Sequence, residues 1–246
     1  MIDKMLVRGA KVHNLKNIDV DIPLNKIVGI AGVSGSGKTT MVLESLVPAL
    51  EAKINGSALP AHIREIRAEG IAHVKLIDAT PIGINVRSTV ATYAGVHDEL
   101  RKLYARSPDA RQKGFKASDF SYNTGSLRCP GCDGTGEVSL DVQFLPDVNI
   151  VCPDCRGSRY ARAAYGVKLM NKAEQAVSLP ELMDMDVNSA LAFCGGMKTV
   201  SQRLQTLQQL GLGYLTLGEE TPSLSGGEAQ RTAIARALYK LSLIHI

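Results

Sequence analysis

Residues 32–39 have the types and spacing of a loop that binds phosphate. They read Gly-Val-Ser-Gly-Ser-Gly-Lys-Thr and fit G-x-x-x-x-G-K-[ST] at every fixed position. Glycines let the backbone turn tightly, so that successive N–H groups point at phosphate oxygens. Lys38 would then reach the β- and γ-phosphates, and the Thr39 hydroxyl would bind Mg²⁺. The alternative is a glycine-rich turn with a chance lysine. We predict an ATP and Mg²⁺ site at Gly32, Val33, Ser34, Gly35, Ser36, Gly37, Lys38, Thr39 and Thr40.

A second helix start with anion-binding character lies near the C-terminal end. Residues 224–231 read Leu-Ser-Gly-Gly-Glu-Ala-Gln-Arg, and residues 232–238 continue with helical composition and spacing. A serine and two glycines at a helix N-terminus can receive an anion. The alternative is a plain N-cap and turn. We predict that this segment binds nucleotide phosphate through Ser225, Gly226, Gly227 and Glu228.

Four of the five cysteines form two Cys-x-x-Cys pairs separated by nineteen residues. This spacing is typical of a structural zinc site with four thiolate ligands, and nothing nearby indicates an open coordination position. A glycine follows each pair, as expected for a knuckle whose N–H groups turn toward sulfur. A redox dithiol or an iron–sulfur site are the alternatives. We predict structural Zn²⁺ at Cys129, Cys132, Cys152 and Cys155.

Positive charge brackets these cysteines. Residues 101–128 contain seven Lys or Arg against two acids, and residues 156–172 contain five cations and no acid. Such a distribution favours contact with a phosphate backbone, whereas the overall formal charge of +4 neither requires nor excludes nucleic acid. The alternative is a solvated basic face. The candidates for DNA contact are Lys113, Lys116, Arg128, Arg156, Arg159 and Arg162.

The elements that must position these groups follow from hydropathy and breaker residues. We expect strands at 5–7 and 18–22 and a buried strand at 27–31, which leads into the phosphate loop. A helix over 41–47 should end near Pro48, and 72–77 should form another strand. Residues 88–105 and 200–210 should be helical, whereas 107–126 should form a basic loop. The fold class is therefore α/β.

Composition bounds the class of protein. The chain has 246 residues, 45% of them hydrophobic, which is enough for one large or two modest domains. No apolar run approaches the roughly 18 residues of a membrane span, and the N-terminus lacks the layout of a secretion signal. We expect a cytoplasmic protein without a membrane partner.

The phosphate loop and the Leu-Ser-Gly-Gly segment together resemble the ABC ATPase family. In that family the serine–glycine segment of one nucleotide domain closes over ATP held by another. The resemblance implies that Ser225 and Gly227 contact the γ-phosphate of a nucleotide held by a partner. The partner would be a second nucleotide-binding domain, in a homodimer or in a missing half.

Further strings resemble the UvrA family, ABC ATPases of bacterial nucleotide excision repair. The two cysteine pairs precede the Leu-Ser-Gly-Gly segment, and other matching strings include 14–18, 120–123, 144–148, 157–160 and 211–218. The short distance from Lys38 to Cys129 resembles the C-terminal nucleotide-binding half. This resemblance implies an ABC-type P-loop core, here incomplete, with a helical signature subdomain and an inserted zinc module. It also implies binding of damaged double-stranded DNA, ATP hydrolysis, a dimer, and loading of a downstream repair subunit of the excinuclease.

Two departures from that family bear on catalysis. Ala79 stands where the repair proteins usually have a glutamine that senses Mg²⁺ and water. The aspartate–glutamate strand and the switch histidine of the family do not follow Leu238, so we assign no catalytic residue and expect nucleotide to bind better than it is hydrolysed. Residues 241–246 resemble translated adapter sequence, and we expect a non-native tail over 239–246.

These observations give four expected regions. The ATP-binding core covers 1–55, the signature subdomain covers 56–126 and 158–238, the zinc module covers 127–157, and the tail covers 239–246. A rival function is a UvrA-like ABC ATPase of drug resistance or another non-repair role, whose zinc module binds a protein. The string Cys-x-x-Cys-x-Gly-x-Gly at 129–136 also resembles DnaJ chaperones, but the phosphate loop argues against that class.

Overall fold

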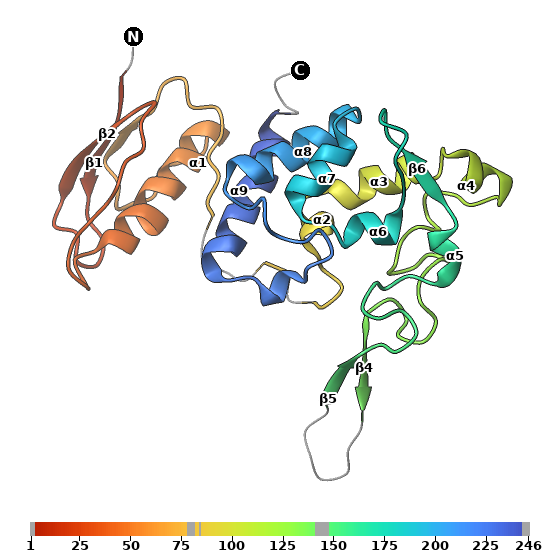
Figure 1. Cartoon of the computed structure of the whole chain (residues 1–246). Helices are drawn as coiled ribbons and strands as arrows, with labels where there is room; N and C mark the ends of the chain where they lie inside the picture. The colour runs from red at the N-terminus through yellow and green to blue at the C-terminus, as the bar shows by residue number, and fades with distance from the viewer. Residues whose placement is uncertain (1–2, 78–81, 84, 141–147, 243–246) are drawn as a thin grey trace. The chain divides into compact units, whose positions relative to one another are not determined.

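The chain divides into two units, Met1–Leu76 and Ile77–Ile246, in a computed structural model that describes residues 3–77, 82, 83, 85–140 and 148–242. Both helices and strands occur, in agreement with the predicted α/β class (Figure 1). The boundaries predicted at residues 55, 126, 157 and 238 stay predictions. Ala79 and most of the string at 144–148 lie outside the described residues, as do the last four residues of the expected tail.

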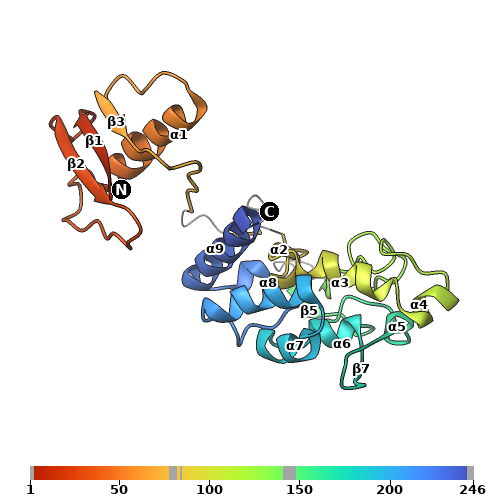
Figure 2. The same cartoon turned by 90° about the horizontal axis from the view of Figure 1, so that it is seen from above.

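The first unit is a small antiparallel sheet with a helix packed on one face (Figure 2). The strand order is β2-β1-β3, so β1 lies in the centre. Alternate residues of β1, among them Met5 and Val7, are buried, whereas the residues of β2 alternate between half-buried and exposed. The elements are β1 (Lys4–Ala10), β2 (Ile18–Pro23), a π-helix (Thr40–Leu46), α1 (Val47–Asn55) and β3 (Glu65–Arg67).

The helix after the phosphate loop was predicted to end near Pro48, but it continues through this residue. The π-helical stretch passes directly into α1, where proline occupies one of the first two positions, and α1 ends at Asn55 before the left-handed Gly56. Proline lacks the N–H that would bond the carbonyl four residues earlier, at Glu44. That carbonyl is bonded instead by Nε2 of His62 at 2.8 Å. A side chain from a distant loop therefore satisfies the carbonyl that proline leaves.

The two further strands predicted in this unit are wrong. Residues 27–31 have no strand structure, and Ile27, Val28 and Ile30 are exposed. A buried strand needs a hydrogen-bonded neighbour on each side, and the three strands of the described sheet pair only with one another. Residues 72–77 are also irregular, and the third strand of the sheet lies earlier, at β3.

The second unit is built around helices, of which α7, α8 and α9 lie side by side (Figures 1 and 2). The main hydrophobic cluster among its described residues includes Leu100, Tyr104, Phe120, Leu182 and Leu204. The helices are α2 (Val90–Tyr93), α3 (Val96–Tyr104), α4 (Pro108–Gln112), α5 (Arg162–Tyr165), α6 (Leu179–Met183), α7 (Val187–Cys194), α8 (Lys198–Gln209), a 3₁₀ turn (Thr221–Ser223) and α9 (Gly226–Ser242).

The single helix predicted over 88–105 is two helices. Thr89 begins α2 with a capping box, and the left-handed Gly95 separates α2 from α3. The carbonyl of Gly95 accepts a hydrogen bond from Arg203 of α8, which fixes the break. The predicted helix over 200–210 is confirmed as α8, and the predicted basic loop contains the short helix α4.

Two hairpins complete the second unit. β4 (Glu137–Leu140) pairs with β5 (Val148–Val151), and β6 (Lys168–Met170) pairs with β7 (Ala176–Ser178), both antiparallel. The β4–β5 hairpin extends away from the helices of this unit (Figure 1). It joins the two cysteine pairs along the chain. Among the described helices, none has the length and apolar character that a membrane span requires.

Candidate nucleotide and metal sites

The phosphate loop forms a closed turn around the side chain of its own lysine. Nζ of Lys38 donates to the carbonyls of Gly32 and Val33, both at 2.7 Å, and lies 3.5 Å from the hydroxyl oxygen of Ser36. Gly35 and Gly37 have positive φ, at 78° and 89°, so the predicted tight turn is present. The amide of Asn14 donates to the carbonyl of Gly35 at 2.7 Å and ties the loop to the segment that follows β1.

The residues of the loop fit a nucleotide phosphate. Lys38 is the charged donor, and the helix that starts beside it presents its positive end to the loop. The carbonyls that Lys38 now contacts lie within the loop itself, so the ammonium is already positioned at the centre of the turn. The loop is largely exposed, as a site for a soluble ligand must be.

The start of α9 is a capping box. The N–H of Ser225 donates to Oε2 of Glu228 at 2.7 Å, and the N–H of Glu228 donates to the hydroxyl of Ser225 at 3.4 Å. Tyr214 donates to the other carboxylate oxygen at 2.5 Å. Hydrogen bonds from Tyr214 and Ser225 lower the pKa of Glu228. The N-cap alternative is therefore present in the structure, beside the predicted anion contact.

Neither the backbone conformation nor the packing of the chain requires glycine at the two glycine positions of this segment. Neither Gly226 nor Gly227 has positive φ. Within the described part of the chain, no atom lies within 4 Å of a Cβ built on Gly226, and a Cβ on Gly227 meets only Arg231 at 3.7 Å. Both are exposed. Local packing therefore gives no reason for glycine here, whereas close approach of an outside group would.

The four predicted cysteines are brought together. Their sulfur atoms all lie within 4.8 Å of one another, with 3.9 Å between Cys129 and Cys152 and 3.6 Å between Cys132 and Cys155. Tetrahedral zinc with Zn–S distances of about 2.3 Å requires sulfurs about 3.8 Å apart. All four side chains are buried, and Val138 of β4 packs against them. The donor set and its spacing fit a closed zinc site.

The two cysteine pairs end in matching turns, which we call the first and second knuckles. The first has Asp133 at φ 52° and Gly134 at φ 78°, and the second has Arg156 at φ 52° and Gly157 at φ 86°. The N–H of Gly136 points at the sulfur of Cys132, 3.2 Å away. The N–H groups of Gly134 and Gly157, one in each left-handed pair, also hydrogen-bond to Cys132 and Cys155, as the sequence predicted from the glycines.

Burial disfavours the charged form of two thiols of the cluster. Burial raises the pKa of Cys129, and it raises that of Cys155 to about 12. Burial opposes ionisation of Cys132 as well, but the N–H of Gly136 and the neighbouring sulfurs bring its pKa to about 7. Four thiolates this close repel one another. A bound divalent cation would offset that repulsion.

Five of the six predicted DNA contacts lie at or near the surface. Lys113, Lys116, Arg156 and Arg162 are exposed, and Arg128 is half-buried and pairs with Asp133 at 3.0 Å. Lys113 donates to the carbonyl of Gly166 at 2.7 Å. Along the chain these residues lie before and after the cysteine pairs, and their contact with DNA stays a prediction.

Arg159 is a correction to the predicted set. Its side chain is 5% exposed, donates to the carbonyl of Val86 at 2.9 Å and pairs with Glu220 at 2.5 Å. A guanidinium held in this way inside the protein cannot contact a DNA backbone. Counting Lys and Arg along the sequence identifies positively charged residues but does not show which of them are buried in ion pairs. Glu220, its partner, was not singled out, and no pattern in the sequence marks it.

Curated relatives and a solved structure match almost the whole chain. UvrABC system protein A of Thermus thermophilus is 40% identical over 238 residues, which is 95% of this chain and 24% of that protein. The proteins of the same name from Staphylococcus aureus N315 and Helicobacter pylori are 40% and 37% identical and cover 97% and 95% of this chain. The crystal structure of UvrA2 from Deinococcus radiodurans has a TM-score of 0.80 at 37% identity, over 96% of this chain and 28% of that one.

The share of the relatives that is covered is small. The chain spans about a quarter of the length of the curated relatives it matches. No protein-family model matches it.

Proposed function

This chain matches a fragment of UvrA, and from that premise we propose that it is an ATP-binding and DNA-binding part of a nucleotide excision repair protein. One observation carries the proposal: a closed phosphate loop and a four-sulfur cluster occur in a single chain that is 40% identical to UvrABC system protein A over 95% of its length. We place the protein in the cytoplasm as part of the same proposal.

ATP binding would exchange the contacts of Lys38. Nζ would leave the carbonyls of Gly32 and Val33 for β- and γ-phosphate oxygens, while the loop N–H groups hold the same phosphates. Thr39 is exposed at the helix start, where its hydroxyl would hold Mg²⁺. The bound cation would neutralise phosphate charge. No residue of this chain is assigned as the base that activates water.

A second nucleotide-binding domain would complete the site. The open space over Gly226 and Gly227 at the exposed start of α9 supports this part of the proposal, because a phosphate of a partner could reach the backbone N–H groups there. The working unit would then be a dimer or a pairing with a missing half. Loading of a downstream excinuclease subunit would follow from that state.

Damaged duplex DNA would be bound through its phosphates. Zn²⁺ would hold the two knuckles together, and the exposed Lys116, Arg156 and Arg162 lie in the segments beside them. A sensor that ignores base sequence must depend on backbone contact and on how easily the duplex deforms.

The test compares a duplex carrying one lesion with the same intact duplex, in the zinc-loaded chain with ATP. We expect tighter binding of the damaged duplex and a steep loss of affinity with salt. Alanine at Lys116, Arg156 and Arg162 should reduce the salt slope by about 0.9 for each phosphate that is no longer neutralised. Alanine at the exposed Lys11, Lys16 and Lys26 of the first unit removes the same charge and is the control. Equal affinity for both duplexes would contradict the repair function.

A further inference from the structure

Arg159 connects the cysteine module to another part of the second unit. Its own carbonyl accepts a hydrogen bond from the N–H of Cys129 at 2.9 Å, and it lies four residues after Cys155. Its φ is 72°, an uncommon value for arginine. The backbone of Arg159 is therefore fixed directly to a predicted metal ligand.

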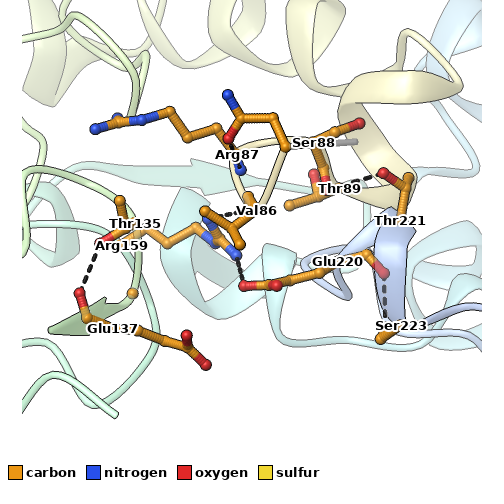
Figure 3. A network of polar contacts seen from close by, with 12 residues as sticks. Val86, Arg87, Ser88, Thr89, Thr135, Glu137, Arg159, Glu220, Thr221 and Ser223 are labelled. Atoms are coloured by element: carbon orange, nitrogen blue, oxygen red, sulfur yellow. Dashed lines mark hydrogen bonds and ion pairs between the residues drawn. The ribbon is translucent and has the colours of Figure 1, made fainter. Parts of the chain in front are cut away.

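The side chain of Arg159 points toward Val86 and Glu220 (Figure 3). Its guanidinium donates to the carbonyl of Val86 at 2.9 Å and to Oε1 of Glu220 at 2.5 Å. It also lies over the ring of Tyr122, 5.4 Å from the centroid. A buried ion pair with this many directed contacts fixes one geometry.

Glu220 begins the turn that leads into α9. Its carbonyl accepts hydrogen bonds from the N–H of Ser223 at 3.1 Å and from the Ser223 hydroxyl at 2.7 Å (Figure 3). Glu220 therefore contacts Arg159 through its carboxylate and the turn through its carbonyl. The N–H of Thr221 donates to the carbonyl of Ser88 at 2.9 Å. Ser225 follows only two residues after Ser223. The position of Glu220 therefore influences the start of α9.

The first knuckle contacts the same segment by a separate route. Arg87 donates to the carbonyl of Asp133 at 2.8 Å and to its carboxylate at 3.2 Å. Asp133 of the first knuckle thus holds Arg87, and Arg159, which follows the second knuckle, holds Val86. The adjacent carbonyl of Ser88 holds the turn before α9. The carbonyl of Arg87 also accepts from the hydroxyl of Tyr122 at 3.0 Å.

We infer that Arg159 is a positioning residue that couples the metal-loaded state of the four cysteines to the start of α9, where Ser225 lies. The inference rests on the proposed function in that the cluster holds Zn²⁺. Loss of the metal removes the order of the knuckles, so the carbonyl of Arg159 loses its partner at Cys129. The guanidinium then no longer holds Glu220, and the turn at Thr221–Ser223 becomes mobile.

Hydrogen exchange followed by mass spectrometry tests the coupling in the whole chain, without DNA. We compare the zinc-loaded protein with the same protein after chelation. In the unsubstituted chain, chelation should raise exchange several-fold in residues 219–229, where the N–H groups of Thr221, Ser223 and Ala229 are bonded. Helix α8 is the internal reference and should keep its protection.

Substitutions separate coupling from a general loss of structure. Arg159→Ala should retain zinc, show raised exchange in 219–229 already, and respond little to chelation. Glu220→Gln keeps the shape of the side chain and should give a weaker version of the same result. Arg156→Ala is the matched control, because Arg156 lies in the second knuckle, three residues before Arg159, and also has positive φ but is exposed. It should respond to chelation like the unsubstituted chain.

The outcomes distinguish this inference from the proposed function. Zinc that binds and is removed without any change in 219–229 overturns the coupling and leaves the metal site intact. An Arg159→Ala protein that responds like the Arg156→Ala control also overturns it. A chain that takes up no zinc contradicts the metal site itself, and the coupling falls with it.

Discussion

The phosphate loop and the cysteine module are both built on left-handed backbone, yet they are held in different ways. Gly35 and Gly37 lie in an exposed loop whose centre is filled by one flexible lysine. The knuckles are buried at their sulfurs and fixed by backbone hydrogen bonds, such as that from Cys152 to Gly136 at 2.9 Å. An exposed loop with exchangeable contacts suits a ligand that comes and goes, whereas a closed cluster suits a resident ion.

The largest effect is expected from a substitution that removes one ligand of the cysteine module. Cys152→Ser should abolish zinc binding and unfold both knuckles, because structural zinc contributes about 10–16 kcal/mol in peptides. Elemental analysis and hydrogen exchange over 129–160 measure the two effects. Cys194→Ala is the control: this cysteine is buried in α7, apart from the cluster, and burial raises its pKa to about 12. Equal loss of zinc in both variants would contradict the assignment.

A substitution in the phosphate loop should lower the affinity for ATP and leave the stability of the fold nearly unchanged. Lys38→Ala removes the charged donor, and we expect ATP affinity to fall about 10- to 100-fold, as for the loss of a charged hydrogen bond of about 1.5–3 kcal/mol. The midpoint of urea unfolding should change little, because the hydrogen bonds of the Lys38 ammonium stay within its own loop. Calorimetric titration with ATP measures the affinity, and Lys16→Ala is the control. ATP affinity equal to that of the control would refute the site.

A matched pair of glycines sharpens the comparison within the module. A Cβ on Gly134 would lie 1.7 Å from the carbonyl oxygen of Tyr122, whereas on Gly157 the nearest atom is Cγ1 of Val151 at 3.7 Å. Both have positive φ, which costs alanine about 1–3 kcal/mol. Gly134→Ala should therefore cost about 3 kcal/mol or more, and Gly157→Ala about 1 kcal/mol. Chemical denaturation of the zinc-loaded chain decides, and equal costs would show that the knuckles tolerate the same change.

The smallest effect concerns the capping box at α6, the structural counterpart of that at α9. Burial would raise the pKa of Glu181, but hydrogen bonds from Lys168 and Ser178 lower it to about 2. A carboxylate with a lowered pKa stabilises the fold above its ordinary value of 4.5, and this contribution is lost as pH falls from there toward 2.

Glu181→Gln should accordingly flatten the dependence of unfolding free energy on pH between 4.5 and 2. The pair with Lys168 is partly exposed, so the change should be about 0.5 kcal/mol. Urea unfolding at a series of pH values measures it, and Glu51→Gln controls for the loss of one surface charge. A slope unchanged from the control would mean that the pair contributes nothing.

Local patterns predicted the local geometry. The phosphate loop and the cysteine pairs each lie within a short stretch whose spacing nearly fixes the geometry, so Lys38 and the four sulfurs are where the sequence placed them. The capping box of Ser225 was also foreseeable, because serine and Glu228 have the required spacing.

Features that depend on distant partners were not predicted. The strand expected over 27–31 needs neighbours that its own residues cannot specify, and none of the described strands lies beside it. The helix through Pro48 depends on His62, and the burial of Arg159 depends on Glu220, 61 residues away. Hydropathy and charge describe a residue's preference but leave its partner open.

The open run at Ile27–Val33 has a consequence for handling the protein. Apolar side chains are exposed to water in the stretch that enters the phosphate loop, at Ile27, Val28, Ile30 and Val33. Molecules in a concentrated sample will tend to adhere through this stretch, since that removes it from water. Titrations with ATP should therefore be run at several protein concentrations, because self-association there would alter the apparent affinity of the phosphate loop for ATP.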